Sequence, residues 1–235
     1  MVALSIVDTN GLAGLTMRSL AEALGVKPMS LYHHVPNKEA ILDGLVDLVF
    51  GEIEVPPAGI GWRDGLRLRT QAVRRVLGHH RWAIGLLESR TSPGPATLQH
   101  HNSVLALLRE SGFSVSSTAH VYSLLDSYAY GFALQEASLP FDGPESVAEA
   151  AESFLTLPLQ EYPFLVEMLT EHVMKPGYDF GAEFDFGLEV LLDSIERLRV
   201  ESPAGLPSVG NASAGNASAG NASVGNASVG NAKSA

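Results

Sequence analysis

Helical spacing of apolar residues is the feature that most constrains how this chain can fold. Through residues 1–200 no alternation typical of a β-strand is sustained, and proline and glycine are spaced as they are at helix ends. The clearest apolar stripe advances by three or four residues at a time, which places its members on one face of an α-helix. They are Phe180, Phe184, Leu188, Leu191, Ile195 and Leu198. The sequence therefore predicts an all-α fold.

Breakers and capping residues divide the helical region into segments. Thr16 precedes one segment and Gly25 ends it, while Asn37 is placed to cap a long helix. A short first helix is expected near residues 1–9. The other helices are expected near residues 17–24, 28–35, 38–53, 62–78, 81–89, 96–111, 116–138, 145–156, 161–174 and 180–200.

The C-terminal residues follow a five-residue repeat. From Asn211 the chain reads NASAG, NASAG, NASVG and NASVG. Gly, Ala, Ser and Asn bury too little apolar area to offset the entropy lost on ordering. We therefore expect residues 201–235 to be a disordered low-complexity tail.

Charge and composition argue against several classes of protein. The 235 residues carry 15 Lys and Arg against 26 Asp and Glu, a net charge of -11, which disfavours a general coat for nucleic acid. The chain has no cysteine, which excludes disulfides, thiolate zinc sites and a cysteine nucleophile. No apolar run reaches the ~18 residues that span a bilayer, and the first residues lack the basic start of a secretory signal. We expect a cytoplasmic protein with no membrane partner.

Two short helical segments within residues 15–38 have the spacing of a helix-turn-helix. Gly25, Val26 and Lys27 separate them. The second helix of such a motif can enter the major groove of DNA. Three cations accompany two acids in residues 1–38, whereas residues 39–54 carry acids alone, so positive charge is concentrated near this second helix. The spacing by itself leaves open a small helical subdomain whose Tyr and His side chains only pack or face solvent.

One specific pattern covers both segments: GLAGLTMRSLAEALGV at residues 11–26, followed by SLYHHVPNK at residues 30–38. It resembles the DNA-binding domain of the tetracycline-repressor (TetR) family. The resemblance continues through residues 1–200 in RLRTQAVRRVLGHHRW, LRESGFS, YGFALQE and FDFGLEVLLDSIERL. It implies an N-terminal three-helix domain with a helix-turn-helix over residues 1–50. It also implies a C-terminal helical domain for ligand binding and dimerisation over residues 51–200.

The resemblance assigns the DNA contacts by position. Arg18 would reach a guanine or a phosphate, Met29 would touch base edges, and Lys38 would bind phosphate at the start of the following helix. For His33 a solvent-facing role without DNA contact remains an equal alternative. The full set of expected DNA-binding residues is Thr16, Arg18, Lys27, Pro28, Met29, Ser30, Tyr32, His33, His34 and Lys38.

The helices near residues 116–138 and 180–200 have apolar faces broad enough for more than one neighbour. Such faces can form an ordinary core within one chain or a four-helix bundle between two chains, and the resemblance implies the bundle. A homodimer is also expected because one reading helix contacts too few base pairs for specific binding. The expected interface residues are Val121, Leu125, Phe184, Leu188, Leu191 and Ile195.

Polar residues on the helices of the C-terminal half are candidates for binding a small-molecule effector. Asp126 is the leading polar anchor, with a structural pairing to an arginine of the same domain as the alternative. A basic series from Arg63 to Arg81 is expected to be solvated or paired with acids. The candidate effector residues are Arg69, Trp82, Leu86, Arg90, His100, Asn102, Asp126, Tyr128 and Gln135.

The resemblance does not extend to tetracycline bound with magnesium. Leu87 and Glu88 stand where that site has a metal-binding histidine, and Gln135 stands where it has a glutamate. Adjacent histidines on a helix point apart and do not form a metal clamp. We expect no metal site and no cofactor.

The sequence thus predicts a transcriptional repressor that binds a pseudo-palindromic operator in double-stranded DNA and is released by an unknown small molecule. The alternative is a structural DNA-binding regulator with no small-molecule ligand. An enzyme is not expected, because no nucleophile, base and orienting group are spaced for catalysis and no phosphate-binding loop is present.

Overall fold

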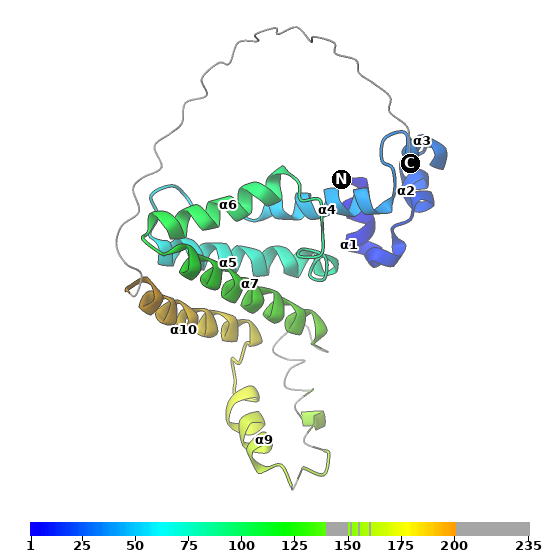
Figure 1. Cartoon of the computed structure of the whole chain (residues 1–235). Coiled ribbons are helices and arrows are strands. Elements are labelled where there is room, and N and C mark those ends of the chain that lie inside the picture. Colours follow the sequence, from blue (N-terminus) through cyan, green and yellow to red (C-terminus); the bar gives the residue numbers. More distant parts are fainter. Residues whose placement is uncertain (140–149, 151, 155, 160, 201–235) are drawn as a thin grey trace, which may run out of the picture. The chain divides into compact units, whose positions relative to one another are not determined.

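A computed structural model describes residues 1–139, 150, 152–154, 156–159 and 161–200 (Figure 1). The described residues form helices and connecting turns and contain no strand, so the predicted all-α fold is confirmed. The expected tail at 201–235 and most of the helix expected near 145–156 lie outside the described residues.

Four helices form the N-terminal part, which we call the head. They are α1 (Val2–Gly14), α2 (Met17–Ala23), α3 (Pro28–Tyr32) and α4 (Lys38–Glu52). The first helix runs further than expected, because Gly11 adopts φ 66° and ψ 179° and allows a kink rather than an end.

Side-chain caps fix where the next helices of the head begin. Thr16 and Ser19 form a reciprocal capping box at the start of α2. Asn37 accepts a hydrogen bond from the backbone N–H of Ala40, at 2.9 Å, and so begins α4.

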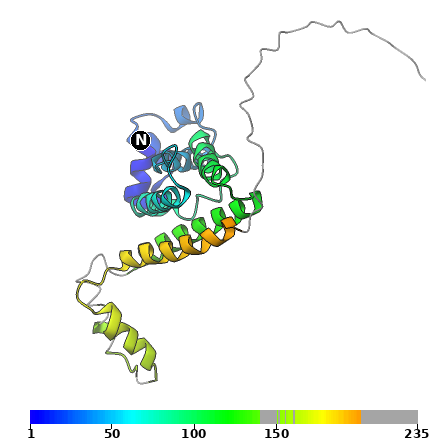
Figure 2. The ribbon, with the colours of Figure 1, turned by 90° about the vertical axis from the view of Figure 1, so that its left-hand side faces the viewer.

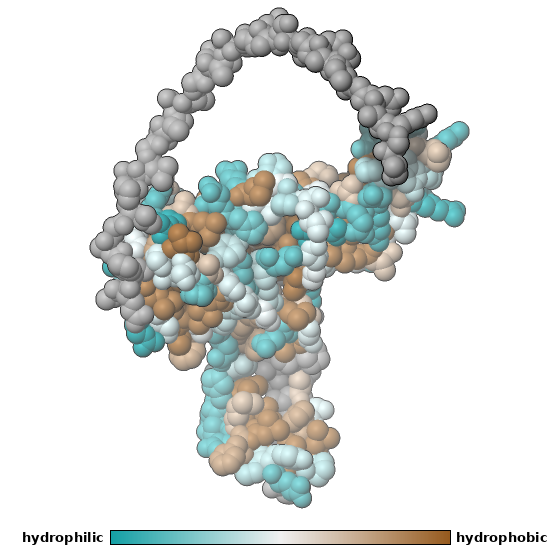
Figure 3. Space-filling view, in the orientation of Figure 1, coloured by the Kyte–Doolittle hydropathy of each residue, from teal (hydrophilic) through white to brown (hydrophobic). Residues whose placement is uncertain are grey.

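The remaining helices form the part that we call the sensor half. They are α5 (Trp62–His79), α6 (Pro95–Glu110), α7 (Val115–Ser138), α9 (Pro163–Met168) and α10 (Phe180–Val200). Leu169–Val173 continues α9 as a π-helical turn, η2. The two long helices α7 and α10 lie side by side in both ribbon views (Figure 2). Apolar side chains gather on the surface of the segment that carries α9, where Phe164 is 82% exposed (Figure 3).

The helix expected at residues 81–89 is wrong. The structure has a single 3₁₀ turn there, η1 (Arg81–Ala83), followed by further turns. Gly85 lies in the middle of the segment and lowers its helical propensity. Trp82 and Leu86 instead pack against the apolar clusters of both the head and the sensor half.

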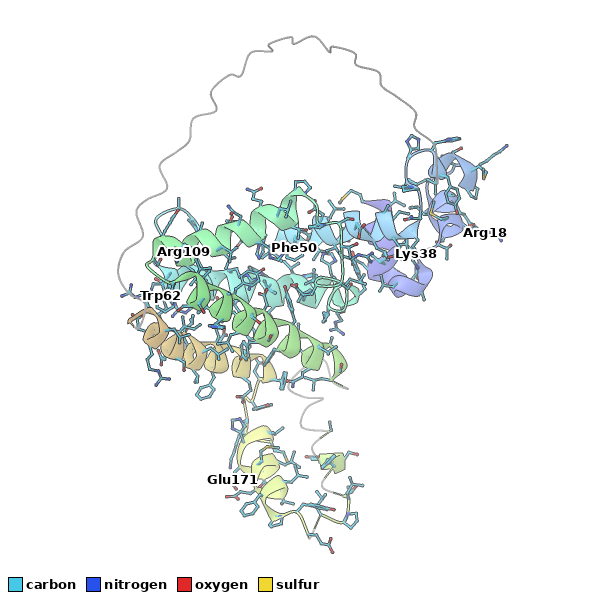
Figure 4. All side chains as sticks on the ribbon, viewed as in Figure 1. Arg18, Lys38, Phe50, Trp62, Arg109 and Glu171 are labelled. Carbon is cyan, nitrogen blue, oxygen red and sulfur yellow. The ribbon has the colours of Figure 1, made fainter. Side chains whose placement is uncertain are left out.

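Three apolar clusters hold the head, α5, α6, α7 and α10 together. One lies within the head, and one joins α5, α6, α7 and α10. The third contains Val46, Val49 and Phe50 of α4 together with residues of α5 and α7. Phe50 is 1% exposed and lies between the helices of the sensor half (Figure 4). The second half of α4 therefore belongs to the core of the sensor half.

Candidate DNA interface and interior polar cluster

The second helix of the helix-turn-helix is α3, which we call the reading helix. One side of α3 packs in the apolar cluster of the head, and its other side is exposed. Leu31 is 7% exposed and packs in the head cluster, while Met29 and Tyr32 are 72% and 48% exposed. Pro28 occupies the first turn, where its missing N–H costs nothing, and Gly25 adopts φ 67° in the turn before it. The local sequence thus presents a short, rigid helix with a free face.

Nine of the ten expected DNA-binding residues are exposed, and they come from the start of α2, the turn before α3, α3 itself and the turn after it. Arg18 lies at the outer edge of the head (Figure 4). In the part of the chain that the structure describes, Arg18 and Lys27 form no ion pair, so both cations remain available for phosphate. Thr16 caps α2, and Lys38 is half-buried and donates to the backbone carbonyl of Leu12.

An ion pair lies in the interior of the sensor half. Arg69 on α5 is 1% exposed and pairs through Nη1 with Oδ1 of Asp126 on α7, which is 6% exposed. Its Nε donates to Nε2 of His100 on α6 at 3.2 Å. Three of the expected effector residues therefore meet at one point, contributed by three helices.

Burial sets the protonation of the groups around this pair. Desolvation, together with the charge of Arg69, lowers the pKa of His100 to about 3, so the ring is neutral and its Nε2 can accept a hydrogen bond. Desolvation also lowers the pKa of His101 and raises that of Tyr122. His101 Nδ1 and the Tyr122 hydroxyl are hydrogen-bonded.

The cluster is not fully satisfied by the described residues. Within the described part, Arg69 Nη2 and His100 Nδ1 have no hydrogen-bond partner. Buried polar groups without partners cost free energy, and each calls for an explanation such as strain, a bound water or a ligand. The spacing of Tyr122 and Asp126, four residues apart and so on one face of α7, is the sequence signal that could have added Tyr122 to the candidates.

Two cavities open near these helices. The smaller has a volume of about 160 Å³ and lies beside the cluster, where its lining includes Asp43, Leu87, Arg90, Pro93, Thr97 and His101. The larger, of about 730 Å³, lies between α5, α7 and the start of α10. Arg74 lines the larger cavity, but its guanidinium is already bound to Glu136 and to the carbonyl of Gly181.

The other expected effector residues lie apart from the cluster. Trp82 donates to Asp8 of α1 at 2.6 Å, and Arg90 lines the smaller cavity. Tyr128 donates to the carbonyl of Phe184 at 2.8 Å and packs against α10. Leu86 is half-buried, and Asn102 and Gln135 are exposed. None of the expected effector residues lines the larger cavity.

The residues expected at a dimer interface lie in the core of the single chain. Their spacing had allowed this arrangement as the alternative to a bundle between two chains. Leu191 is half-buried and the other five, Val121, Leu125, Phe184, Leu188 and Ile195, are each at most 1% exposed. The physical reason is that α7 and α10 pack their broadest apolar faces on each other and on α5 and α6. Among the described side chains of these two helices, the large apolar ones left exposed are Val115, Leu124, Leu134, Phe186 and Val190.

Among the described residues, no helix combines the length and apolar character that a membrane crossing requires.

Comparisons with known proteins agree with this architecture. Residues 2–45 match the family described as bacterial regulatory proteins, tetR family, and residues 55–199 match the tetracyclin repressor-like C-terminal domain. An HTH-type transcriptional regulator of Saccharopolyspora erythraea is 31% identical over 191 residues, 81% of this chain and 79% of the relative. The transcriptional repressor DrrR1 of Streptomyces coeruleorubidus is 30% identical over 206 residues, 83% of this chain and 75% of the relative.

A solved structure supports the same assignment. ActR of Streptomyces coelicolor in complex with actinorhodin has 29% sequence identity and a TM-score of 0.72, with 86% of this chain and 95% of ActR covered. Regulators of this type bind operator DNA as homodimers and respond to small-molecule effectors, which confirms the partners expected from the sequence at the level of the family. The chain belongs to the TetR family of bacterial transcriptional regulators.

Proposed function

We propose that this chain is a repressor that binds a pseudo-palindromic operator as a homodimer and leaves it when a small molecule enters the sensor half. The head supplies DNA binding through the exposed face of α3 and the free cations Arg18 and Lys27. The named relatives include a transcriptional repressor, and the relative ActR is seen with a bound small molecule. The chain acts by binding and not by catalysis.

The observation that carries the response to an effector is the incompletely satisfied cluster of Arg69, Asp126 and His100. Replacing a buried ion pair by well-packed apolar side chains is often neutral or stabilising, so such a pair is weak evidence for a role in stability alone. Its free donor on Arg69 and its position beside a cavity suit a ligand that carries a hydrogen-bond acceptor.

The smaller cavity offers the entry to this cluster. His101 lines the cavity and is hydrogen-bonded to Tyr122, whose ring lies against the guanidinium of Arg69, 5.5 Å from its central carbon. An effector that displaces the His101–Tyr122 contact reaches the buried pair. The alternative, a structural DNA-binding regulator without a ligand, predicts that no compound changes DNA binding.

Operator binding is tested with DNA from the region immediately upstream of the protein's own gene. Footprinting locates the protected sequence, and fluorescence anisotropy gives the dissociation constant of the full chain. Two symmetric protected half-sites support the proposal, and the absence of any sequence-specific protection contradicts it for this region. Actinorhodin and tetracycline serve as first effector probes, followed by a panel of small polar aromatic compounds.

Effector binding is read by thermal stabilisation and by release of the operator duplex. The double variant Arg69→Met with Asp126→Leu removes the polar cluster while keeping an apolar core. We expect it to bind operator and to lose the response to an active compound. A double variant that still responds normally places the effector site elsewhere, with the larger cavity as the next position to test.

A further inference from the structure

Three acids on α4 lie in one row along the helix. Glu39, Asp43 and Asp47 are spaced by four residues, which places them on one face, where like charges destabilise a helix. Each is bound by a residue within 90–97, the stretch of the sensor half that leads into α6 and includes its first residues. Arg90 Nη2 lies 2.6 Å from Glu39, and its Nε lies 2.7 Å from Asp43. The backbone N–H of Thr97 donates to Asp47 at 2.8 Å.

Arg90 is held in a defined geometry by these contacts. Its side chain is 14% exposed, and that of Asp43 is 23% exposed, so both are partly shielded from water. A guanidinium presents its donors in a planar fork and can bind two carboxylates at once, which a lysine ammonium on a flexible stem does less well. One arginine therefore neutralises two of the three acids.

Gly94 shows how closely the same stretch approaches α4. A Cβ atom built on Gly94 would clash with the carboxylate of Asp47. Gly85, by contrast, lies in the preceding turns, and a Cβ atom there meets nothing within 4 Å. The contact between residues 90–97 and α4 thus depends on the absence of a side chain at one position.

The position of α4 fixes that of the reading helix. Only residues 33–37 separate α3 from α4, and the turn is closed by hydrogen bonds from the backbone N–H groups of His34 and Val35 to Leu31. A shift of the first turns of α4 therefore moves α3 with it.

We propose that Arg90 is a positioning residue for DNA binding, which holds the first turns of α4 through Glu39 and Asp43 and thereby holds α3 in its DNA-binding position. This inference rests on the proposed function, because it names a residue that sets the affinity of the head for operator DNA.

The first experiment measures operator affinity of the full chain for three charge variants without any effector. Arg90→Gln removes both ion pairs, and Arg90→Lys keeps the charge but not the fork. Arg67→Gln is the matched control, since Arg67 also binds two carboxylates, Asp64 and Glu189, but touches no residue of α4. We expect Arg90→Gln to weaken binding about tenfold, a typical coupling between two sites. Arg90→Lys should lose much of the same affinity, and Arg67→Gln should change it less than about twofold.

A second pair of variants tests the contact with no change in charge. Gly94→Ala places a Cβ where the Asp47 carboxylate lies, so the carboxylate must leave its contact with Thr97; operator binding should weaken, whereas Gly85→Ala should not change it. Hydrogen exchange should show faster exchange in α4 in Arg90→Gln, Arg90→Lys and Gly94→Ala, and not in the two controls Arg67→Gln and Gly85→Ala. A merely structural role would instead lower the melting temperature without a specific change in operator affinity or in exchange of α4.

The outcomes separate the inference from the proposed function. Wild-type protein that fails to bind any operator overturns the proposed function. Wild-type protein that binds, together with Arg90→Gln, Arg90→Lys and Gly94→Ala that bind equally well, overturns the inference alone. If Arg90→Gln does not fold, the two folded variants Arg90→Lys and Gly94→Ala decide the question against their controls.

Discussion

Lys38 Nζ lies 3.0 Å from the backbone carbonyl oxygen of Leu12, so the first residue of α4 is bonded to the last turn of α1. From the family resemblance we expect this lysine to bind a phosphate of the DNA. In the structure its ammonium instead donates to a carbonyl near the end of a kinked helix, which also accepts a hydrogen bond from the backbone N–H of Leu15. The two roles have different experimental signatures.

Lys38→Met tests the structural role of this hydrogen bond. The substitution keeps an unbranched side chain and removes the donor, so we expect the free energy of unfolding to fall by about 1 kcal/mol. Chemical denaturation of the full chain, followed by circular dichroism, measures the change. A variant of unchanged stability whose operator affinity falls with a smaller salt dependence assigns Lys38 to phosphate instead.

Arg18→Ala tests the exposed cations of the head. Each phosphate contact contributes about -0.9 to the slope of log K against log salt concentration, through release of counterions. We expect the variant to bind operator more weakly and with a slope reduced by about that amount. Anisotropy titrations over a series of salt concentrations give the slope. Arg109→Ala, on α6 of the sensor half, is the control and should leave the slope unchanged.

The double variant Phe186→Asp with Val190→Asp tests whether the exposed apolar side chains of α10 form the interface between the two chains of the homodimer. These side chains are 70% and 50% exposed in the single chain, and they are four residues apart on α10. Carboxylates in an apolar interface cost free energy without partners, so we expect a folded monomer that no longer shifts operator DNA. Light scattering and circular dichroism measure mass and folding. A dimer that persists places the interface on other residues.

The interior ion pair predicts an asymmetric mutational pattern. Asp126→Ala leaves the buried guanidinium of Arg69 without its counter-charge and should lower the free energy of unfolding by about 3–5 kcal/mol. The double variant Arg69→Met with Asp126→Leu removes both charges and should be more stable than the single variant. Denaturant unfolding of the three proteins provides the comparison. Equal destabilisation in the single and double variants would contradict a buried, unsatisfied charge.

His80 makes the stability of the fold depend on pH. Its Nδ1 lies 2.7 Å from Asp8 of α1, and its Nε2 lies 3.0 Å from Glu52 of α4. Burial lowers the pKa of the imidazole, but the hydrogen bonds to the two carboxylates outweigh burial, so the net pKa is raised above 6.5. The contribution of protonated His80 is fully present below that unfolded-state value and is lost as pH rises through the folded-state pKa.

The His80→Gln variant isolates this effect. Between about pH 6 and about pH 9 the free energy of unfolding of the wild type should fall more than that of the variant. Urea denaturation at a series of pH values measures both. His79→Gln is the control, because His79 is exposed and, among the described residues, its ring is hydrogen-bonded to the backbone carbonyl of Arg75 and to no carboxylate. If the free energies of unfolding of the wild type and of His80→Gln change with pH in parallel, His80 is not protonated in its contacts with Asp8 and Glu52.

The sequence was most informative where structure depends on neighbours along the chain. Thr16, Gly25 and Asn37 act locally, by capping or by a left-handed turn, and the helices that they bound were predicted to within a few residues. The segment after His80 was not, because its conformation depends on the packing of Trp82 and Leu86 against distant residues. Local propensity gives no account of such contacts.

The candidate sites could be predicted only in part, because they are formed by side chains that are far apart in the sequence and meet only in the fold. Asp126 could be singled out as a charge on an apolar helix, but spacing does not show that Arg69 and His100 lie beside it. The row of acids on α4 was visible as a charge pattern, and its partners Arg90 and Thr97, which lie far along the chain, were not. The apolar face of α10 was predicted, while the chain's own helices, and not a second copy, cover most of it.

The division of α4 between two cores limits how this protein can be rebuilt. Ile41, Leu42 and Leu45 pack in the head, whereas Val49 and Phe50 pack with α5 and α7. A chimaera cut at residue 50 would graft a foreign helix end into the sensor half and leave mismatched side chains there. Recombination that exchanges only residues up to 45 keeps the second half of α4 with the core that surrounds it. Engineers who retarget this regulator to a new promoter should therefore place the junction inside the helix and not after it.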